Sequence, residues 1–454
     1  MYKIILENTV CGNASDGVIM LAAEKIIKEA FGGDTELMIF DHDAETSQDI
    51  YLEQYFRPTI AGRLYTVNPK PGTFSRWAAW YKNLKSDIAL WAAKQNKWRL
   101  VTFLLGYDLS DDVKHYVEAD MIITNGGSYL MEYYNLQERL KQFEIDTYFG
   151  KPPVLFTQSL GPFTKLENRE KIKSVLDATP LVLLRDRQSQ IYLQDLLEQP
   201  QKSFILADSA FALMDHTLVD EKLMAAVAPE VEKVAISVRV WPYLRKRNAR
   251  EGMQIYMEAI ASLTERLVKH YGIEVTFISS CQGLAHYKYD DAKLARRIVS
   301  GLSRSVQEKV VVMDDYHHPQ EIMDILKHMD LVVATRMHMM IMALNVGVPV
   351  LPIAYEFKTT ELLRSMGLRD TACDMETITA GDLRAKADKI IGNYTDYRKR
   401  ILKAAKAQHV SAMKAAPLLK SAYYQKGQKR YSPAISHHKN NTAMRTRNVV
   451  SQAA

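Results

Sequence analysis

The chain has 454 residues, of which 47% are hydrophobic and 25% are charged, which is the balance of a globular protein with enough apolar surface for two cores. Its three cysteines, Cys11, Cys281 and Cys373, form neither a disulfide framework nor a zinc-ligand spacing, and this favours a reducing compartment. The first residues lack the apolar core of a signal peptide, and no run of about 18 apolar residues predicts a membrane span. We therefore expect a cytoplasmic protein.

The formal net charge of +6 comes from the C-terminal end. From Ser421 onward the sequence has six basic residues and no acidic one, so the rest of the chain carries 53 residues of each sign. This polar, aperiodic end, residues 421–454, predicts a basic disordered tail. The simplest role for this tail is to keep the protein soluble. A basic tail can also support peripheral contact with anionic lipid at the inner face of the membrane. A neutral body gives no indication of nucleic-acid binding.

Short apolar strands alternate with helical patterns along the chain, which favours βαβ units and parallel sheets. In residues 1–215 we expect strands at Tyr2–Leu6, Glu36–Phe40, Arg99–Leu105, Met121–Thr124, Val154–Thr157, Leu181–Leu184 and Phe204–Ala207. A polar connection follows, and residues 233–400 predict strands at Val234–Val238, Val275–Ser279, Val310–Met313, Leu331–Ala334 and Val350–Ala354. Residues 401–420 are helical in pattern and are expected to pack back across both halves. The sequence thus predicts an α/β fold of two Rossmann-like, doubly wound parallel-sheet domains facing each other across a cleft.

Segment 331–358, LVVATRMHMMIMALNVGVPVLPIAYEFK, is the most informative stretch, because it predicts strand, sharp turn, helix and strand. Arg336 and His338 then lie at a helix N-terminus, just after the carboxyl end of a buried parallel strand. Open α/β sheets bind ligands at this position, and the backbone N–H groups there favour anions. Lys358 lies four residues beyond the following strand. The alternative is a capped helix with two solvated polar residues.

Two more arginines follow predicted strands directly. Arg185, in LLRDRQS, follows a buried strand, where a charge is costly unless it is paired or faces a ligand, and Asp186 is a possible structural partner. Arg239, in SVRVWP, ends the first strand of the second half, although exposed cations in such a loop usually form a solvated surface. Four cations gathered in one cleft, with Arg336 and Lys358, would repel one another unless an anion neutralised them. We therefore predict a small multivalent anion as ligand, and no metal, because no ligand cluster with metal spacing is present.

Three polar turns follow strands of the first half. CGNASDG places Asn13 and Asp16 at a helix start, TNGGSYL places Gly126 and Gly127 where the backbone can approach a bound group, and QSLGPF places the Gln158 amide at a strand end. Each turn alone is more often structural than functional, and none is a dinucleotide-binding fingerprint.

Four of the five tryptophans lie between residues 77 and 98. Trp77, Trp80, Leu84, Ile88 and Trp91 recur at helical spacing and are flanked by lysines and arginines. A helix of this kind can lie at a membrane interface or stack on sugar rings. Core packing is the more common use of such a face, and it is what we expect here.

Taken in order, the segments NASDG, NGGSYL, QSLGPF, LRDRQS, ADSAF, SVR and ATRMHMMIMALNVGVPVLPIAYEFK resemble the polysaccharide pyruvyl transferase family, over about residues 8–366. There are two mild departures, Asn125-Gly126-Gly127 in place of three glycines and Arg185-Asp186 in place of Arg-Glu. The resemblance implies a two-domain fold like that of the GT-B glycosyltransferases. It also implies transfer of pyruvate from phosphoenolpyruvate onto a sugar as a ketal, in the synthesis of an exopolysaccharide or another cell-surface glycan.

Phosphoenolpyruvate agrees with the charge argument, because it carries a phosphate and a carboxylate and is a donor substrate that needs no cofactor. The resemblance implies that Arg336 and Arg185 hold these two groups, with support from Lys358 and Arg239. His338 would protonate the enol carbon or the departing phosphate, since its ordinary pKa suits either step.

On the acceptor side, Asp16 is the candidate to orient or deprotonate a sugar hydroxyl, and the binding candidates are Asn13, Gly126, Gly127 and Gln158. The acceptor sugar has no readable code, and a lipid-linked oligosaccharide is one option. Two alternatives stay open, a GT-B glycosyltransferase with a nucleotide-sugar donor and a diverged, non-catalytic binding protein on the same fold.

Overall fold

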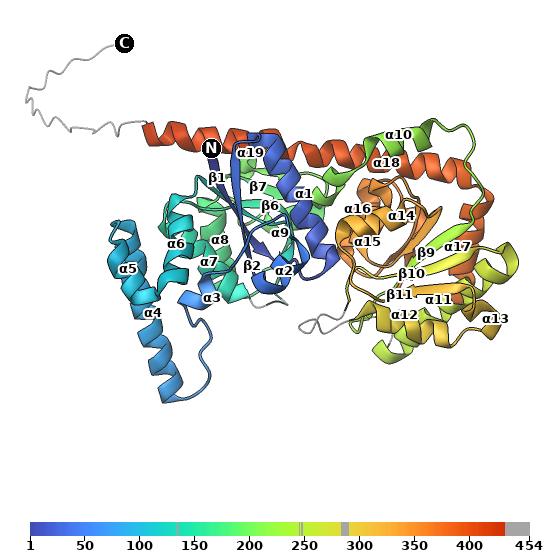
Figure 1. The fold of residues 1–454 in the computed structure, drawn as a ribbon, viewed down its shortest axis with the longest axis horizontal. Helices are drawn as coiled ribbons and strands as arrows, with labels where there is room; N and C mark the ends of the chain where they lie inside the picture. Colours follow the sequence, from blue (N-terminus) through green and yellow to red (C-terminus); the bar gives the residue numbers. More distant parts are fainter. Residues whose placement is uncertain (133, 135, 245, 247, 283–289, 432–454) are drawn as a thin grey trace, which may run out of the picture.

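The structure, a computed structural model, describes residues 1–132, 134, 136–244, 246, 248–282 and 290–431. Two parallel β-sheets lie side by side, and each is flanked by helices (Figure 1). The predicted fold class, two Rossmann-like parallel-sheet α/β domains, is therefore confirmed.

The first sheet has the order β3-β2-β1-β4-β6-β7-β8, with β5 paired to β6. Its strands are β1 (Tyr2–Thr9), β2 (Thr35–Asp41), β3 (Phe56–Pro58), β4 (Met121–Thr124), β5 (Gly127–Leu130), β6 (Val154–Leu160), β7 (Val182–Leu184) and β8 (Ser203–Ile205). The helices of this half are α1 (Ala14–Phe31), α2 (Ala44–Ile50), α3 (Ala61–Leu64), α4 (Thr73–Lys94), α5 (Trp98–Leu105), α6 (Tyr107–Glu118), α7 (Leu136–Tyr148), α8 (Leu166–Ala178) and α9 (Arg187–Leu193).

The second sheet has the order β11-β10-β9-β12-β13-β14. Its strands are β9 (Lys233–Ser237), β10 (Glu274–Ile278), β11 (Val310–Met313), β12 (Leu331–Ala334), β13 (Val350–Ala354) and β14 (Cys373–Asp374). Its helices are α11 (Ala249–Tyr271), α12 (Asp291–Ser300), α13 (Arg304–Gln307), α14 (Pro319–Leu326), α15 (Met337–Asn345), α16 (Phe357–Ser365) and α17 (Ala380–Gly392). Because β12 and β13 are buried at every residue, their continuous apolar sequences suffice to predict them.

Both sheets reverse their strand order at one place, between β1 and β4 in the first and between β9 and β12 in the second. The carboxyl ends of these strands are where ligands bind in doubly wound folds. The two domains also touch near this edge, because the Ser15 hydroxyl of α1 lies 2.8 Å from the hydroxyl of Ser280, just after β10. The fold therefore places the predicted site residues at one edge of each sheet.

One predicted strand is wrong. Residues Arg99–Leu105 form the helix α5, which packs against α4 and α6. A short apolar run does not separate a strand from a helix by its pattern alone, and this run is rich in leucine and phenylalanine with only Val101 buried. The region between β3 and β4 is therefore a helical arm, α4 to α6, at the side of the first domain (Figure 1).

The expected core packing of the tryptophan-rich face is also wrong. In α4 the small side chains, among them Ala79, Ser86 and Ala89, are buried, whereas Trp77 is 60% exposed and Trp80 is 58% exposed. The periodicity predicts the apolar face correctly, but it cannot show what covers that face.

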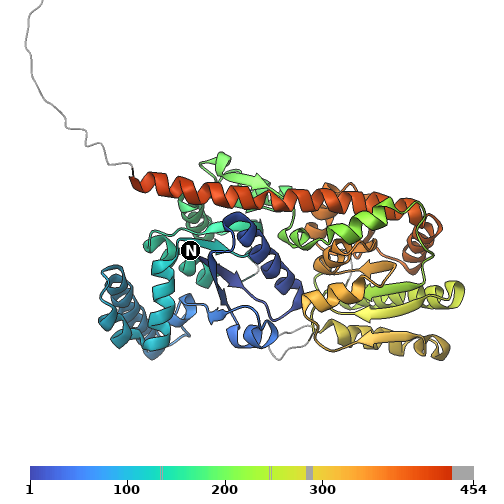
Figure 2. The ribbon, with the colours of Figure 1, turned by 45° about the horizontal axis from the view of Figure 1, so that its top comes forward.

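The chain returns across both domains in its last helices. The connection between the domains contains η2 (Ser209–Leu213) and α10 (His216–Met224). Helix α18 (Tyr394–Met413) packs against η2 and against α10. The following helix α19 (Ala415–Tyr431) packs on α1, so this pair of helices lies along both domains in both views (Figures 1 and 2). Where the sequence predicts disorder from residue 421, helix α19 continues to Tyr431; residues 432–454 lie outside the described residues. None of the described helices combines the length and the apolar content needed to cross a bilayer.

Candidate active site

Asp208 links the two domains through one carboxylate. Its Oδ2 accepts a hydrogen bond of 2.6 Å from Arg185 Nη1, at the end of β7, and lies 3.5 Å from His338 Nε2, on α15. Burial alone would raise the pKa of Asp208, but Arg185 and His338 hold it below its ordinary range. The side chain of Asp208 therefore stays ionised and orients a basic group from each domain.

The hydroxyl of Ser128 also lies between cations of the two domains. Its Oγ accepts a hydrogen bond of 2.8 Å from Arg185 Nη2 and lies 3.5 Å from Lys358 Nζ of α16. Burial alone would lower the pKa of Lys358, but Glu356, whose Oε2 is 2.8 Å from Nζ, raises it above its ordinary value. Arg239 and Arg185 oppose this rise, which places both guanidinium groups within electrostatic range of Lys358.

Arg336 is the N-cap residue of α15, and its Nε donates to a carboxylate oxygen of Asp291 at the start of α12. Only 11% of the Arg336 side chain is exposed. Burial alone would lower the pKa of Arg336, but Asp291 raises it above its ordinary range, so the guanidinium stays charged.

Arg239 follows β9 and has aromatic neighbours. Its Nη1 donates to the Tyr355 hydroxyl, and its guanidinium lies 4.3 Å from the ring centroid of Tyr355 and 5.0 Å from that of Trp241. Its Nε is buried without a hydrogen-bond partner among the described residues. Because no described carboxylate forms an ion pair with Arg239, it supplies positive charge to this edge of the site.

The structure brings the predicted cations together but corrects their pairing. Arg185, Arg336 and Lys358 each have a carboxylate partner within the protein, so the predicted strong mutual repulsion is wrong for these three. Asp186, the expected partner of Arg185, instead caps α9, where its Oδ1 accepts a hydrogen bond of 2.7 Å from the Ser189 backbone N–H. Among the described residues, the site retains a modest positive excess from Arg239 and from His338 when it is protonated.

In the first domain, Asn13 caps α1 and its side-chain N–H donates to Asp16 Oδ2 at 2.6 Å. The Tyr129 hydroxyl donates to the other oxygen of Asp16, also at 2.6 Å. Asp16 is partly exposed, so its carboxylate is held in place by the protein without being closed off from a substrate.

The other predicted binding residues of the first domain shape the turns. A Cβ on Gly126 would lie 2.6 Å from Thr157 Oγ1, and Gly127 has a φ of 147°, which disfavours other residues. Gln158 is fully buried, and its Nε2 donates to the backbone carbonyl of Asn125. These contacts fix the turns on either side of Ser128.

The sequence interpretation missed three carboxylates, Asp208, Asp291 and Glu356. Asp208 lies shortly after β8, so the rule that found Arg185 at a strand end would also have found it. Glu356 lies two residues before Lys358, within the segment already singled out. Asp291 had no signal, because 45 residues separate it from Arg336. No three metal-ligating side chains gather among the residues that the structure describes.

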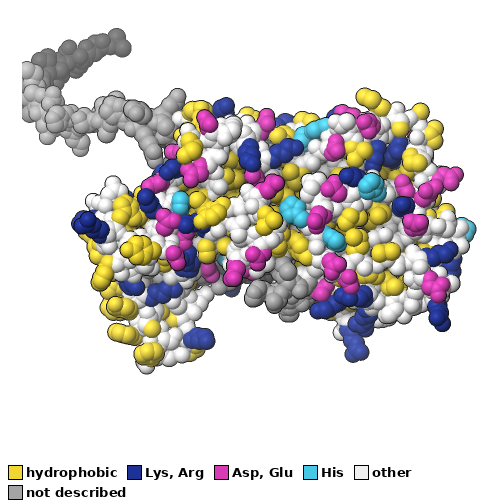
Figure 3. Space-filling view, in the orientation of Figure 1, with side chains coloured by type: hydrophobic (Ala, Val, Ile, Leu, Met, Phe, Trp, Pro, Cys, Tyr) yellow, Lys and Arg dark blue, Asp and Glu magenta, His cyan; other side chains and the backbone are white. Residues whose placement is uncertain are grey.

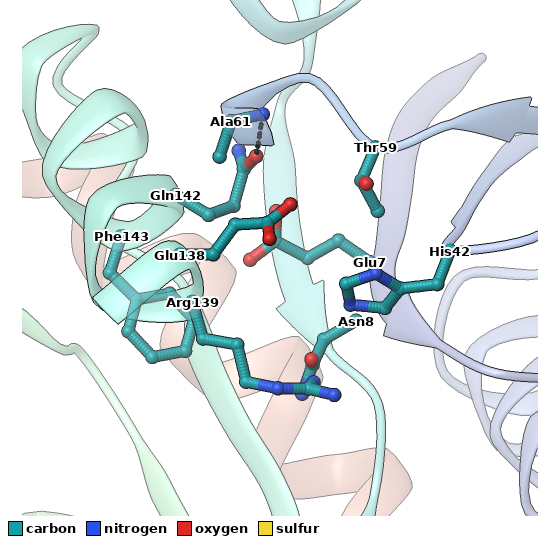
Figure 4. A pocket seen from close by; sticks show the side chains of 9 residues that line it. All are labelled: Glu7, Asn8, His42, Thr59, Ala61, Glu138, Arg139, Gln142 and Phe143. Atoms are coloured by element: carbon teal, nitrogen blue, oxygen red, sulfur yellow. Dashed lines mark hydrogen bonds between the residues drawn. The ribbon is translucent and has the colours of Figure 1, made fainter. Parts of the chain in front are cut away.

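A cavity lies inside the first domain, between the end of β1 and α7 (Figure 4). Asn8, His42, Glu138 and Arg139 line it, and Phe143 adds an apolar wall. Both side-chain polar atoms of Asn8 and Nη1 of Arg139 are buried without hydrogen-bond partners among the described residues.

The cavity adjoins the site through Tyr129. The Arg139 guanidinium lies 4.6 Å from the centroid of the Tyr129 ring, and the hydroxyl of the same ring holds Asp16. One aromatic ring therefore separates the polar cavity from the carboxylate.

Solved structures with the same fold include a UDP-N-acetylglucosamine 2-epimerase, with a TM-score of 0.54, 11% identity and coverage of 95% of this chain and 98% of that one. The UDP-GlcNAc 2-epimerase from Neisseria meningitidis, solved bound to UDP-GlcNAc, has a TM-score of 0.52 at 11% identity and covers 93% and 100%. At this identity the likeness shows the fold, which is GT-B-like.

In sequence, the chain is 27% identical over 327 residues to the amylovoran biosynthesis protein AmsJ of Erwinia amylovora, covering 69% of this chain and 74% of that protein. The family model described as polysaccharide pyruvyl transferase matches residues 16–356 and so includes Asp16, Arg185, Asp208 and His338. Because this match covers most of the chain, it confirms the resemblance seen in the motifs: the chain belongs to the polysaccharide pyruvyl transferase family.

Proposed function

We propose that this chain transfers pyruvate from phosphoenolpyruvate to two hydroxyls of one sugar, forming a ketal and releasing phosphate. The observation that carries the proposal is the meeting of Arg185 and His338, from opposite domains, at the Asp208 carboxylate. Membership of the pyruvyl transferase family and the likeness to an amylovoran biosynthesis protein support the same reaction class, in the synthesis of an exopolysaccharide.

The donor binds among the cations at the interdomain edge. Arg239 has a buried Nε without a described partner, and Lys358 keeps part of its side chain exposed, so both have donors to offer to a phosphate or carboxylate. Arg336 uses only its Nε for Asp291 within the described residues, which leaves its terminal nitrogens for the same anion. Arg185 donates through all three nitrogens to Asp208, Ser159 and Ser128, so its role is to position these groups.

His338 supplies the proton in this proposal. Protonation of C3 of the donor makes C2 electrophilic, and a sugar hydroxyl attacks C2; a second hydroxyl then displaces phosphate as the C2–O bond to phosphate breaks. Of the two protons that the hydroxyls release, one replaces the proton delivered to C3 and the other leaves with phosphate. Asp208 holds the imidazole of His338 in place, and Asp16 orients the attacking hydroxyl.

The acceptor sugar occupies the cavity of Figure 4. The unpartnered amide of Asn8 and Nη1 of Arg139 suit the hydroxyl groups of a sugar. A His42→Ala variant should raise the KM for the acceptor while leaving the KM for phosphoenolpyruvate unchanged. The exposed His328→Ala variant is the control, and an equal change in both KM values would contradict this placement.

The donor is tested by binding and by turnover. Phosphoenolpyruvate should raise the Tm of the protein more than the same concentration of inorganic phosphate does. A panel of sugar acceptors, including lipid-linked oligosaccharides, should then release phosphate from phosphoenolpyruvate, and the acceptor should gain the mass of a pyruvate ketal. Phosphate release without any acceptor product, or no release with the whole panel, would contradict the proposal.

The second candidate is a glycosyltransferase with a nucleotide-sugar donor, because a neighbour with the same fold was solved bound to UDP-GlcNAc. It predicts that UDP or GDP, and not phosphoenolpyruvate, raises the Tm. The two donors therefore separate the two candidates in one assay.

A further inference from the structure

In the helical arm, helix α4 has its large apolar residues on its solvent-exposed side. We define its aromatic face as Phe74, Trp77, Trp80, Tyr81, Leu84, Ile88 and Trp91, whose exposed fractions run from 42% to 81%. The opposite side of α4 packs small residues against the protein, with Ala89 and Ala93 fully buried. Figure 3 shows hydrophobic side chains along the outside of this arm, where it projects from the first domain. Contiguous exposed apolar surface of this kind marks an interaction site on a soluble protein.

The charges around the aromatic face are almost all positive. Residues 66–105 contain seven basic residues and one acidic residue, Asp87, whose carboxylate already accepts a hydrogen bond of 2.7 Å from the Tyr65 hydroxyl. Lys97 lies 4.5 Å from the ring centroid of Trp91, whereas Arg76 and Lys85 form no ion pair with any described residue. This segment therefore has a net charge of +6 beside an exposed apolar stripe.

We propose that the aromatic face of α4 docks the protein on an anionic lipid bilayer. Trp and Tyr rings are amphipathic and favour the headgroup level of a bilayer, and the flanking cations match the negative charge of anionic lipids. A second copy of the chain would fit the heptad spacing of the stripe, but it would bring a second positively charged segment against the first. The helix lies on the surface of the bilayer and does not enter as a span.

Docking would also serve the proposed function, because a protein held at the membrane meets lipid-linked acceptors at high local concentration. The docking itself does not depend on that function. It is measured without donor or acceptor, so its failure and the failure of the pyruvyl transfer are separate results.

The test uses the full chain with vesicles of phosphatidylcholine, with and without phosphatidylglycerol. Because four of the five tryptophans lie between residues 77 and 98, their fluorescence reports on this segment. We expect cosedimentation and a blue shift with the anionic vesicles only, quenching by brominated lipid, and weaker binding at high salt. A Trp77→Ser, Trp80→Ser double variant should bind at least about tenfold more weakly, and Arg76→Gln or Lys85→Gln about fivefold more weakly each.

Two controls isolate the aromatic face. The exposed apolar residues Val227, in the connection before β9, and Val311 of β11 are replaced by serine, which should leave vesicle binding unchanged. Replacement of Lys439, Arg445 and Arg447 by glutamine tests the basic end of the chain. Circular dichroism and thermal unfolding show that each variant is folded.

Three results would overturn the proposal. The first is a failure of the wild-type chain to bind anionic vesicles, and the second is binding that the tryptophan variant retains but the Lys439, Arg445 and Arg447 variant loses. The third is a particle of twice the 51.8 kDa chain mass in light scattering that the tryptophan variant reduces to one chain, since a second copy would then cover the face.

Discussion

The carboxyl edges of the two sheets have similar strand orders but use their polar residues differently. At the first edge, Asn13 caps a helix and Gln158 holds the backbone of a neighbouring turn. At the second edge, His338 and Lys358 extend to partners in the other domain, Asp208 and Ser128. The position of a polar residue at a strand end therefore predicts which edge of the sheet its side chain lies on. Its contacts decide whether the side chain stabilises a turn of its own domain or reaches the other domain.

The largest expected effect is at the second edge. A His338→Ala variant should lose about 10²- to 10⁴-fold in kcat for pyruvyl transfer, because no proton donor remains beside Asp208. The Tm should change little, since the imidazole Nε2 lies 3.5 Å from the carboxylate and has no hydrogen-bond partner among the described residues. His328→Ala, at an exposed position, is the matched control. Full activity of the His338 variant in steady-state assays would refute its assignment.

The next effect tests the carboxylate that both edges share. An Asp208→Asn variant leaves the buried Arg185 without its ion-pair partner and should lower the free energy of unfolding by about 3 kcal/mol at neutral pH. The exposed Asp195→Asn variant should change it little. Urea unfolding measures both, and equal stability of wild type and Asp208→Asn would contradict the structural role of this pair.

The same variant has a defined pH dependence. Because the folded state holds the pKa of Asp208 below its ordinary value, the carboxylate stabilises the fold above the unfolded pKa of about 3.9. That stabilisation is lost as the pH falls further, toward the folded pKa. The difference between wild type and Asp208→Asn should therefore shrink below about pH 4.

These effects show what the sequence could and could not predict. The strands Met121–Thr124, Leu331–Ala334 and Val350–Ala354 were predicted to the residue, because short buried apolar runs bounded by turns define parallel strands. Residues Arg99–Leu105 have an equally apolar pattern but lie in a helical arm, and only packing against α4 and α6 distinguishes the two cases. Local patterns therefore predict elements well where burial is complete and poorly where an element stands at the surface.

The same limit applies to the candidate site. Arg185, Arg336 and Lys358 were found because each follows a strand, but their pairing was not predictable from local sequence. Asp208 and Asp291 join them only through the fold, across 23 and 45 residues of sequence. The structure gives three of these cations carboxylate partners, and the sequence analysis named none of these carboxylates as a partner.

The third prediction tests whether the first edge is structural. A Gly126→Ala variant should lose about 2 kcal/mol of unfolding free energy, because its Cβ would lie 2.6 Å from Thr157 Oγ1 and 3.0 Å from Ile19 Cγ2. Gly33→Ala is the matched control, since no atom lies within 4 Å of the added Cβ there. Thermal unfolding compares the two. If Gly126→Ala keeps full stability but raises the KM for the acceptor, the glycine serves the ligand and not the turn.

The smallest expected effect lies beneath the first edge, at Glu7 of β1. Burial raises the pKa of this carboxyl to about 7, although Thr124 and Tyr116 donate hydrogen bonds of 3.2 Å to it. Asp146 is buried next to it and its pKa is raised as well, so the pair holds a proton at a pH where an exposed carboxyl has lost it.

The sign of the pH effect follows from this proton. Between about pH 4.5 and 7 the folded state keeps a proton that the unfolded chain releases, so the contribution of Glu7 to stability falls as the pH rises through that window. A Glu7→Gln variant, which stays neutral, should gain about 1 kcal/mol relative to wild type between pH 5 and pH 6 in urea unfolding. The exposed Glu29→Gln variant should show no such gain. A constant difference between Glu7→Gln and wild type across this range would mean that Glu7 is ionised in the folded protein, and that the first edge, like the second, holds a buried charge.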